Sequence, residues 1–211
     1  MRAQANASRP LCKRTWSELV SAKIMAQAHA LESLDKPSAR ILKLASEVKS
    51  GDPDNREAVA AQAYWPTLFT SDFRRNRDLP GINAMLNYGY AVLRSATARA
   101  IVSAGLHPSL SLHHVSNSDA YCLADDLMEP FRPAIDLLVV DLNSRGASME
   151  DIETRAELAG VLHADYLTDN GHTPLSVVLV RLAQSLAAIF EGSGKGLNLP
   201  KSKIPLARAQ V

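Results

Sequence analysis

The sequence has few of the features that mark several large classes of protein. Only two of its 211 residues are cysteines, Cys12 and Cys122, and their wide separation argues against a disulfide framework or a zinc site built on cysteine pairs. No apolar run approaches the roughly 18 residues of a membrane span, and no apolar stretch follows the charges at the N-terminus as in a secretory signal. We therefore expect a soluble, cytoplasmic protein that does not act at a membrane.

Neither sign of charge dominates the chain. Lys and Arg total 23 and Asp and Glu total 22, so the formal net charge is +1. This balance gives no global argument for or against nucleic-acid binding, and any basic surface must be local. With 46% hydrophobic and 21% charged residues, the composition is that of an ordinary globular protein, which excludes wholesale disorder.

Aromatic residues are also scarce, at 5%, and alternation of apolar and polar residues is almost absent. Apolar residues instead recur at helical spacing, so we predict an all-α fold with at most a short hairpin at Asn170-Gly171. Residues 80–105 are apolar nearly all round, which is typical of a helix buried at the centre of a domain. Other helices are predicted over residues 15–34 (opened by a Thr15–Glu18 capping box), 37–51, 133–145 and 174–192 (capped by Thr173). Three more helices are predicted. One is capped by Asp52 or Asp54 and disrupted near its end by Pro66. Another begins at about Ser118 and is interrupted by Pro130 and Pro133, and the third is opened by Ser148 with Asp151 in the capping-box position.

The chain divides into three parts on composition. Residues 1–12 are predicted to be a linker-like leader, and residues 13–191 form the helical domain. Residues 192–211 mix Gly, Pro, Lys and Arg without periodicity, so we expect a flexible, mildly basic tail.

The candidate chemistry lies in a carboxylate stripe and a histidine pair. Asp125, Asp126 and Glu129 are three or four residues apart, so we expect their carboxylates to project from one side of a helix. A solvated acidic face is the ordinary explanation of such a stripe. However, His113 and His114 lead into this helix, and imidazole beside carboxylate oxygens suits a divalent metal ion.

Several segments carry a resemblance to a known family. They are EAVAAQAYW from Glu57, NAMLNYGYAVLRSATARAIVSAGLHPSLSLHH from Asn83, AYCLADDLMEPFRPAIDLLV from Ala120 and, near the start, KRTWSELVSAKIMAQA. Together they resemble CRISPR-associated protein one, the integrase of CRISPR spacer acquisition, from about residue 13 to residue 191. They are most similar to the forms that accompany single-protein RNA-guided effector nucleases.

The resemblance implies a site and an activity. Glu57, which would otherwise be taken for a surface glutamate, would coordinate Mg²⁺ or Mn²⁺ together with His114 and Glu129. Asp126 would be a close acidic neighbour, and His113 stays open as an alternative to His114. The implied enzyme is a metal-dependent DNA endonuclease and integrase of the prokaryotic cytoplasm. In it, the 3′-hydroxyl of a captured DNA segment attacks the repeat boundary of a CRISPR array, and hydrolysis is a side activity.

The resemblance also implies partners. These are double-stranded DNA (the captured segment and the CRISPR repeat), the second-numbered CRISPR-associated protein and a second copy of the chain in a homodimer. Members of the family begin with a β-rich domain that builds the homodimer, and this sequence does not contain one. We therefore expect the catalytic domain of a longer architecture. The alternative is a non-catalytic helical module that binds DNA or a partner.

Basic residues near the central helix are candidates for DNA contacts. Arg74, Arg75 and Arg77 lie in FRRNRD, where they could bind phosphates, and a solvated surface is the alternative. Tyr88 and Tyr90 in NYGY could stack on a base or strand end, but core packing is the expected role.

Overall fold

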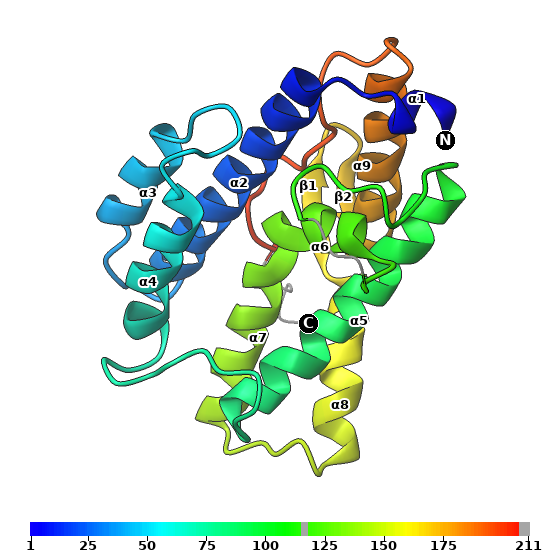
Figure 1. The fold of residues 1–211 in the computed structure, drawn as a ribbon. Helices are drawn as coiled ribbons and strands as arrows, with labels where there is room; N and C mark the ends of the chain where they lie inside the picture. The colour runs from blue at the N-terminus through cyan, green and yellow to red at the C-terminus, as the bar shows by residue number, and fades with distance from the viewer. Residues whose placement is uncertain (115–117, 207–211) are drawn as a thin grey trace.

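The computed structural model describes residues 1–114 and 118–206, and this part of the chain is mostly helical. The predicted all-α class is therefore confirmed, with a single short hairpin in the described residues (Figure 1). The α-helices are α1 (Arg2–Ala5), α2 (Arg9–Glu32), α3 (Ala39–Ser46), α4 (Arg56–Leu68), α5 (Ile82–Ser103), α6 (Cys122–Met128), α7 (Arg132–Ser144), α8 (Ile152–Ala159) and α9 (Leu175–Phe190). Short 3₁₀ turns span Glu129–Phe131 and Gly160–His163, and the hairpin joins β1 (Asp165–Thr168) to β2 (Gly171–Pro174).

The central helix is α5, as the all-round apolar pattern predicts. It packs against α6, α7, α8 and α9, and its buried residues include Met85, Leu86, Leu93 and Ile101. The other helix with many neighbours is α2, which packs against α3, α4, α6 and α7. Figure 1 shows α3 and α4 on one side of α2, while α5 and the later helices lie on the other side. Residues from both halves of the chain therefore pack against α2.

The first twelve residues are mostly helical, in α1 and the start of α2, rather than a linker without secondary structure. Helix α2 starts at Arg9, not at Thr15, because Ser8 Oγ accepts a hydrogen bond from Leu11 N (3.4 Å) and caps it. Gln4 of α1 is buried, and its side-chain amide nitrogen donates to the carbonyls of His107 (3.0 Å) and Leu110 (2.8 Å). The start of the chain thereby holds the loop that leads to the histidine pair.

Helix α4 begins at Arg56 and is capped from two sides. Asn55, with φ of 50°, is the N-cap residue, and the Asp52 carboxylate accepts hydrogen bonds from the backbone N–H of Arg56 (2.8 Å) and Glu57 (3.0 Å). Asp52 is thus confirmed as a capping residue, whereas Asp54 pairs with Lys49 instead. Pro66 does not end the helix, which continues to Leu68.

The two prolines after α6 produce a change of helix type. Helix α6 starts at Cys122 rather than Ser118, and the 3₁₀ turn Glu129–Phe131 joins it to α7. Pro130 and Pro133 lie in the first turns of the two segments that follow, where no intrahelical N–H is required. Glu129 therefore lies at a corner between α6 and α7.

Helices α5, α7 and α9 start and end within two residues of their predicted bounds, whereas α3 ends at Ser46, five residues before Gly51. Thr173 lies in β2 and does not cap α9, whose N-cap residue is Pro174. The strands pair antiparallel with Tyr166 opposite Thr173. Their turn is Asp169-Asn170, one residue before the expected Asn170-Gly171, and Gly171, with φ of 81°, begins β2. Asp151 is the N-cap of α8. No helix among the described residues is long and apolar enough to span a membrane. Residues 193–206 contain no helix or strand, but Leu197, Leu199 and Ile204 pack against the core. The flexibility expected of this tail stays a prediction, and residues 207–211 lie outside the described residues.

Candidate metal centre

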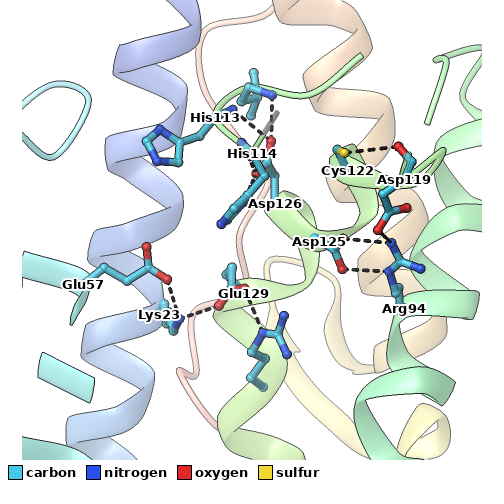
Figure 2. A network of polar contacts seen from close by, with 12 residues as sticks. Lys23, Glu57, Arg94, His113, His114, Asp119, Cys122, Asp125, Asp126 and Glu129 are labelled. Atoms are coloured by element: carbon cyan, nitrogen blue, oxygen red, sulfur yellow. Dashed lines mark hydrogen bonds and ion pairs between the residues drawn. The ribbon is translucent and has the colours of Figure 1, made fainter. Parts of the chain in front are cut away.

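Two glutamates from different parts of the chain meet at one lysine. Glu57 lies in the first turn of α4, Glu129 lies at the corner after α6, and Lys23 projects from the middle of α2. The Lys23 Nζ atom is 2.6 Å from Glu57 Oε1 and 2.5 Å from Glu129 Oε2. Figure 2 shows the ammonium group between the two carboxylates. The fold thus brings together two of the three predicted ligands.

Glu129 is held as a buried anion. Its side chain is 5% exposed, and Arg132 Nε donates to its Oε1 atom over 2.8 Å. Burial alone would raise the pKa of Glu129, but the positive charges of Lys23 and Arg132 outweigh burial and lower the pKa to about 2. The carboxylate is therefore ionised at neutral pH.

Lys23 is correspondingly held as a buried cation. Burial disfavours its charged form, but attraction to Glu129 and Glu57 outweighs burial and raises the pKa of Lys23. Lys23 was not singled out from the sequence, where one lysine among many carries no signal. Four residues that lie within about one turn of Lys23 along α2 are buried: Leu19, Val20, Ile24 and Gln27. The apolar character of the first three is the only hint in the sequence that this part of the helix is buried.

His114 is oriented by a buried aspartate. Asp126 is fully buried, and its Oδ1 atom lies 2.6 Å from His114 Nδ1. The same carboxylate accepts backbone N–H bonds from Leu112 (2.6 Å), His113 (3.1 Å) and His114 (3.3 Å). The hydrogen bond to Asp126 raises the pKa of His114. In the neutral ring, this contact places the proton on Nδ1 and the lone pair on Nε2, which is how carboxylates orient metal-binding histidines.

His113 occupies a different environment. Its ring stacks on the buried Trp16 ring with centroids 4.5 Å apart and planes 1° from parallel. The cavity that Lys23 and Glu129 line is also lined by His114, but not by His113. Between the two histidines that the sequence left open, the geometry therefore favours His114.

The expected acidic stripe is not a single site. Asp125 bonds to Arg94 of α5 through Oδ1 and Nε (2.7 Å) and through Oδ2 and a terminal guanidinium nitrogen (2.9 Å). Asp126 instead holds the histidine loop, and Glu129 faces Lys23. Asp125 and Glu129 do line the same cavity, but the expectation that all three carboxylates project together is wrong for Asp126, which is fully buried against the histidine loop.

A cavity of about 820 Å³ opens beside these residues. Its lining includes Lys23, His114 and Glu129, and four arginines add positive charge to it: Arg75, Arg77, Arg94 and Arg132. Arg75 is anchored by Asn83 Oδ1 (3.0 Å) and Asn87 Oδ1 (2.6 Å). Arg74 is not part of this lining and bonds to the carbonyls of Ser71 and Phe73. The fold thus separates Arg74 from Arg75 and Arg77, which both line the cavity.

A buried polar cluster supports the cavity wall. Asp136 of α7 accepts hydrogen bonds from the hydroxyls of Tyr64 (3.0 Å) and Tyr90. The guanidinium of Arg132 lies 4.6 Å from the centre of the Tyr90 ring, so a chain of contacts runs from Tyr64 to Glu129. Tyr90 is buried, as core packing predicts, and its hydroxyl is committed to Asp136. The cluster was not predicted because its members come from three helices.

The described residues contain no group of three His, Cys, Asp or Glu side chains gathered closely enough to hold a metal ion. Lys23 stands between the two glutamates, and His114 is bonded to Asp126. The donor types nevertheless fit a small divalent cation, because two carboxylate oxygens already converge on one positive charge and the imidazole of His114 borders the cavity that Glu129 lines.

Comparison with known proteins identifies the family of the chain. Residues 1–170 match the sequence profile of the family described as CRISPR associated protein Cas1. The chain belongs to the Cas1 family. The resemblance found in the sequence segments is thereby confirmed.

Three curated relatives in the Cas1 family cover between 71% and 100% of this chain. A CRISPR-associated endonuclease Cas1 from Neisseria meningitidis serogroup C is 37% identical over 215 residues, which cover 100% of this chain and 70% of the relative. Two further curated relatives are matched over 52% and 64% of their length. This Cas1 chain therefore spans between about half and 70% of these three relatives.

Solved structures share the fold. A casposase bound to integration product superposes with a TM-score of 0.78 at 23% identity, covering 100% of this chain and 70% of that chain. A Cas6-RT-Cas1–Cas2 complex superposes with a TM-score of 0.72 at 19% identity, covering 92% of this chain and 25% of that chain. At these identities the likeness shows a common fold.

Proposed function

We propose that this Cas1-family chain is a divalent-metal-dependent DNA endonuclease and integrase whose metal ligands are Glu57, His114 and Glu129. One observation carries the proposal: Glu57 and Glu129, from separate helices, converge on a single cation at 2.6 and 2.5 Å. Asp126 orients the imidazole of His114 at the same cavity. In this proposal Asp126 positions His114 and does not itself bind the ion, in keeping with the close acidic neighbour that the family resemblance implies.

The protein residues prepare the site for phosphate chemistry. A bound Mg²⁺ or Mn²⁺ would supply a Lewis acid for an in-line displacement at phosphorus. Arg132 holds the Glu129 carboxylate through Oε1, and its charge faces the cavity where a phosphate would lie. The attacking oxygen is a DNA 3′-hydroxyl in integration and water in cleavage, so the same residues serve both reactions.

DNA binding would use the positive part of the cavity. Arg75 and Arg77 line the same cavity as Lys23, and phosphate contacts of this kind position a duplex without reading its sequence. The proposed partners are double-stranded DNA (captured segment and CRISPR repeat), a Cas2-like protein and a second copy of the chain. The casposase and the Cas2-containing assembly that share this fold support the first two, and a prokaryotic cytoplasmic location is proposed with them.

The test is a cleavage and strand-transfer assay with Mn²⁺ on the 211-residue chain. We expect Glu129→Ala and His114→Ala each to lower the rate at least about 100-fold, because each removes one ligand of an ion worth several kcal/mol of transition-state stabilisation. In the same variants, the rise in melting temperature on adding Mn²⁺ should shrink.

His113→Ala is the matched control, since His113 is the adjacent imidazole but stacks on Trp16 away from the cavity lining. It should keep both the activity and the stabilisation by Mn²⁺. Equal activity in the wild type and in both ligand variants would refute the site. DNA binding without metal-dependent catalysis in the wild type would favour the non-catalytic module.

A further inference from the structure

Lys23 has an unusual position for a lysine. Its side chain is only 12% exposed, and its ammonium group is the one cation that contacts both Glu57 and Glu129 among the described residues. Arg132 contacts the other carboxylate oxygen of Glu129, Oε1, and does not pair with Glu57. A single positive charge therefore compensates two carboxylates whose side chains are 21% and 5% exposed.

The Lys23 ammonium group and a divalent metal ion would compete for the same carboxylate oxygen atoms. Lys23 Nζ lies 2.6 Å from Glu57 Oε1 and 2.5 Å from Glu129 Oε2, and a small divalent ion binds carboxylate oxygens at roughly 2.0–2.2 Å. An ion that bridged these two oxygens would have to lie almost where the ammonium nitrogen lies. Two positive charges cannot share that position, so the ion and the ammonium group exclude each other.

We propose that Lys23 is a resident counter-cation, which holds the two glutamates together in the metal-free protein and leaves when a divalent ion binds. The proposal rests on the proposed function, because it takes Glu57 and Glu129 as the metal ligands. Lys23 is thus a positioning residue: it keeps the buried carboxylate of Glu129 and the partly buried carboxylate of Glu57 close together without the charge repulsion that would otherwise separate them.

The structure provides a place for the displaced side chain. Lys23 already lines the 820 Å³ cavity, and the four-carbon stem of lysine allows its ammonium group to turn away from the carboxylates without movement of α2. The displaced charge would join Arg75, Arg77 and Arg94 in the cavity lining. Metal binding would therefore also increase the positive charge available to a phosphate group.

The first experiment measures Mn²⁺ affinity by calorimetry. Lys23→Met removes the competing cation, so we expect Mn²⁺ to bind at least about tenfold more tightly than in the wild type. Without Mn²⁺ the variant should melt at a lower temperature, because two carboxylates lose their shared counter-charge, and Mn²⁺ should raise its melting temperature more than that of the wild type. Lys49→Met is the matched control, since it breaks the exposed pair with Asp54 and should not change Mn²⁺ affinity.

The second experiment needs no variant and follows the lysine directly. The wild-type chain is acetylated briefly with and without Mn²⁺, and labelling at each lysine is measured by mass spectrometry. We expect Mn²⁺ to increase labelling of Lys23 several-fold, because the ammonium group leaves its buried ion pairs for the cavity. Labelling of the exposed Lys49 should not change.

The outcomes separate this proposal from the proposed function. Binding of Mn²⁺ to the wild type with unchanged or reduced labelling of Lys23 would overturn the counter-cation while leaving the metal site intact. Equal or weaker Mn²⁺ affinity in Lys23→Met would do the same, and Lys23→Gln replaces this variant if the methionine variant does not fold. No Mn²⁺ binding to the wild type by either method would overturn the metal site and the counter-cation together.

Discussion

At the scale of single residues, Asp136 links stability to the geometry of the site. Its carboxyl group is 1% exposed and accepts hydrogen bonds from Tyr64 and Tyr90. Burial raises the pKa of Asp136 to about 7, although hydrogen bonds from Tyr90 and Tyr64 and the charges of Arg132 and Lys23 act in the opposite direction. The groups facing this carboxyl therefore come from α2, α4, α5 and α7.

The raised pKa of Asp136 predicts a pH-dependent contribution to stability. Between the unfolded pKa of 3.8 and the folded pKa of about 7, the folded chain binds more protons at this group than the unfolded chain. The contribution of Asp136 is therefore fully present below the unfolded pKa and is lost as the pH rises through about 7. Asp136→Asn cannot titrate, so its free energy of unfolding should improve relative to the wild type between about pH 5 and about pH 8.

Urea unfolding of both proteins at the two pH values checks this. Taking the difference between the two proteins cancels the titration of groups that they share. A difference that stayed constant, or that moved in favour of the wild type as the pH rose, would contradict a raised pKa at Asp136.

At the scale of elements, the distance between α5 and α7 depends on one small residue. A β-carbon added at Gly89 of α5 would lie 2.4 Å from Ile135 Cγ2 of α7, and Ile135 is fully buried. The β-branched side chain of isoleucine cannot easily turn away. Glycine costs helix stability here, yet it allows the contact that brings Tyr90 towards Asp136.

Gly89→Ala should therefore destabilise the chain. Alanine gains roughly 0.5–1 kcal/mol of helix propensity, but overpacking a core contact costs typically about 1–3 kcal/mol, so we expect a net loss of about 1–2 kcal/mol. Chemical denaturation measures the change. Gly160→Ala is the control because nothing lies within 4 Å of an added β-carbon there, and its effect should be small. Increased stability in Gly89→Ala would show that the two helices separate easily.

At the scale of the whole molecule, near-neutrality conceals an uneven distribution of charge. The net charge is +1, yet Lys23, Arg75, Arg77, Arg94 and Arg132 all line the cavity beside the two glutamates. Asp119 and Asp125 pair with Arg94, and Glu129 pairs with Arg132 and Lys23, so part of this positive charge is already compensated. Arg77 is exposed and lines the cavity, so its guanidinium group is accessible to a phosphate.

Arg77→Ala should weaken DNA binding and make it less dependent on salt. Each lost phosphate contact removes roughly 0.9 from the slope of log K against log salt concentration for duplex DNA. Fluorescence anisotropy with a labelled duplex at several salt concentrations measures both quantities. Arg74→Ala is the matched control, because Arg74 does not line the cavity. An equal slope in the wild type and Arg77→Ala would remove Arg77 from the interface.

The sequence by itself determined the helical class, the central helix and most of the helices, because helical periodicity and capping residues act over a few positions. Local patterns were less reliable at boundaries. Helix α2 begins six residues before Thr15 because Ser8 caps it, and α4 continues past Pro66. Family resemblance, rather than periodicity, selected Glu57, His114 and Glu129 as candidate ligands.

Only the tertiary structure decided which side chains meet. Asp125, Asp126 and Glu129 are neighbours in sequence but pair with Arg94, His114 and Lys23 respectively. Lys23 and Glu57 are 34 positions apart, and Tyr64 and Asp136 are 72 apart, yet each pair is in direct contact. Such contacts depend on how helices cross, and the repeat of a single helix carries no information about its crossing partner. For that reason the carboxylates could be named from the sequence, whereas the lysine between them could be found only in the folded chain.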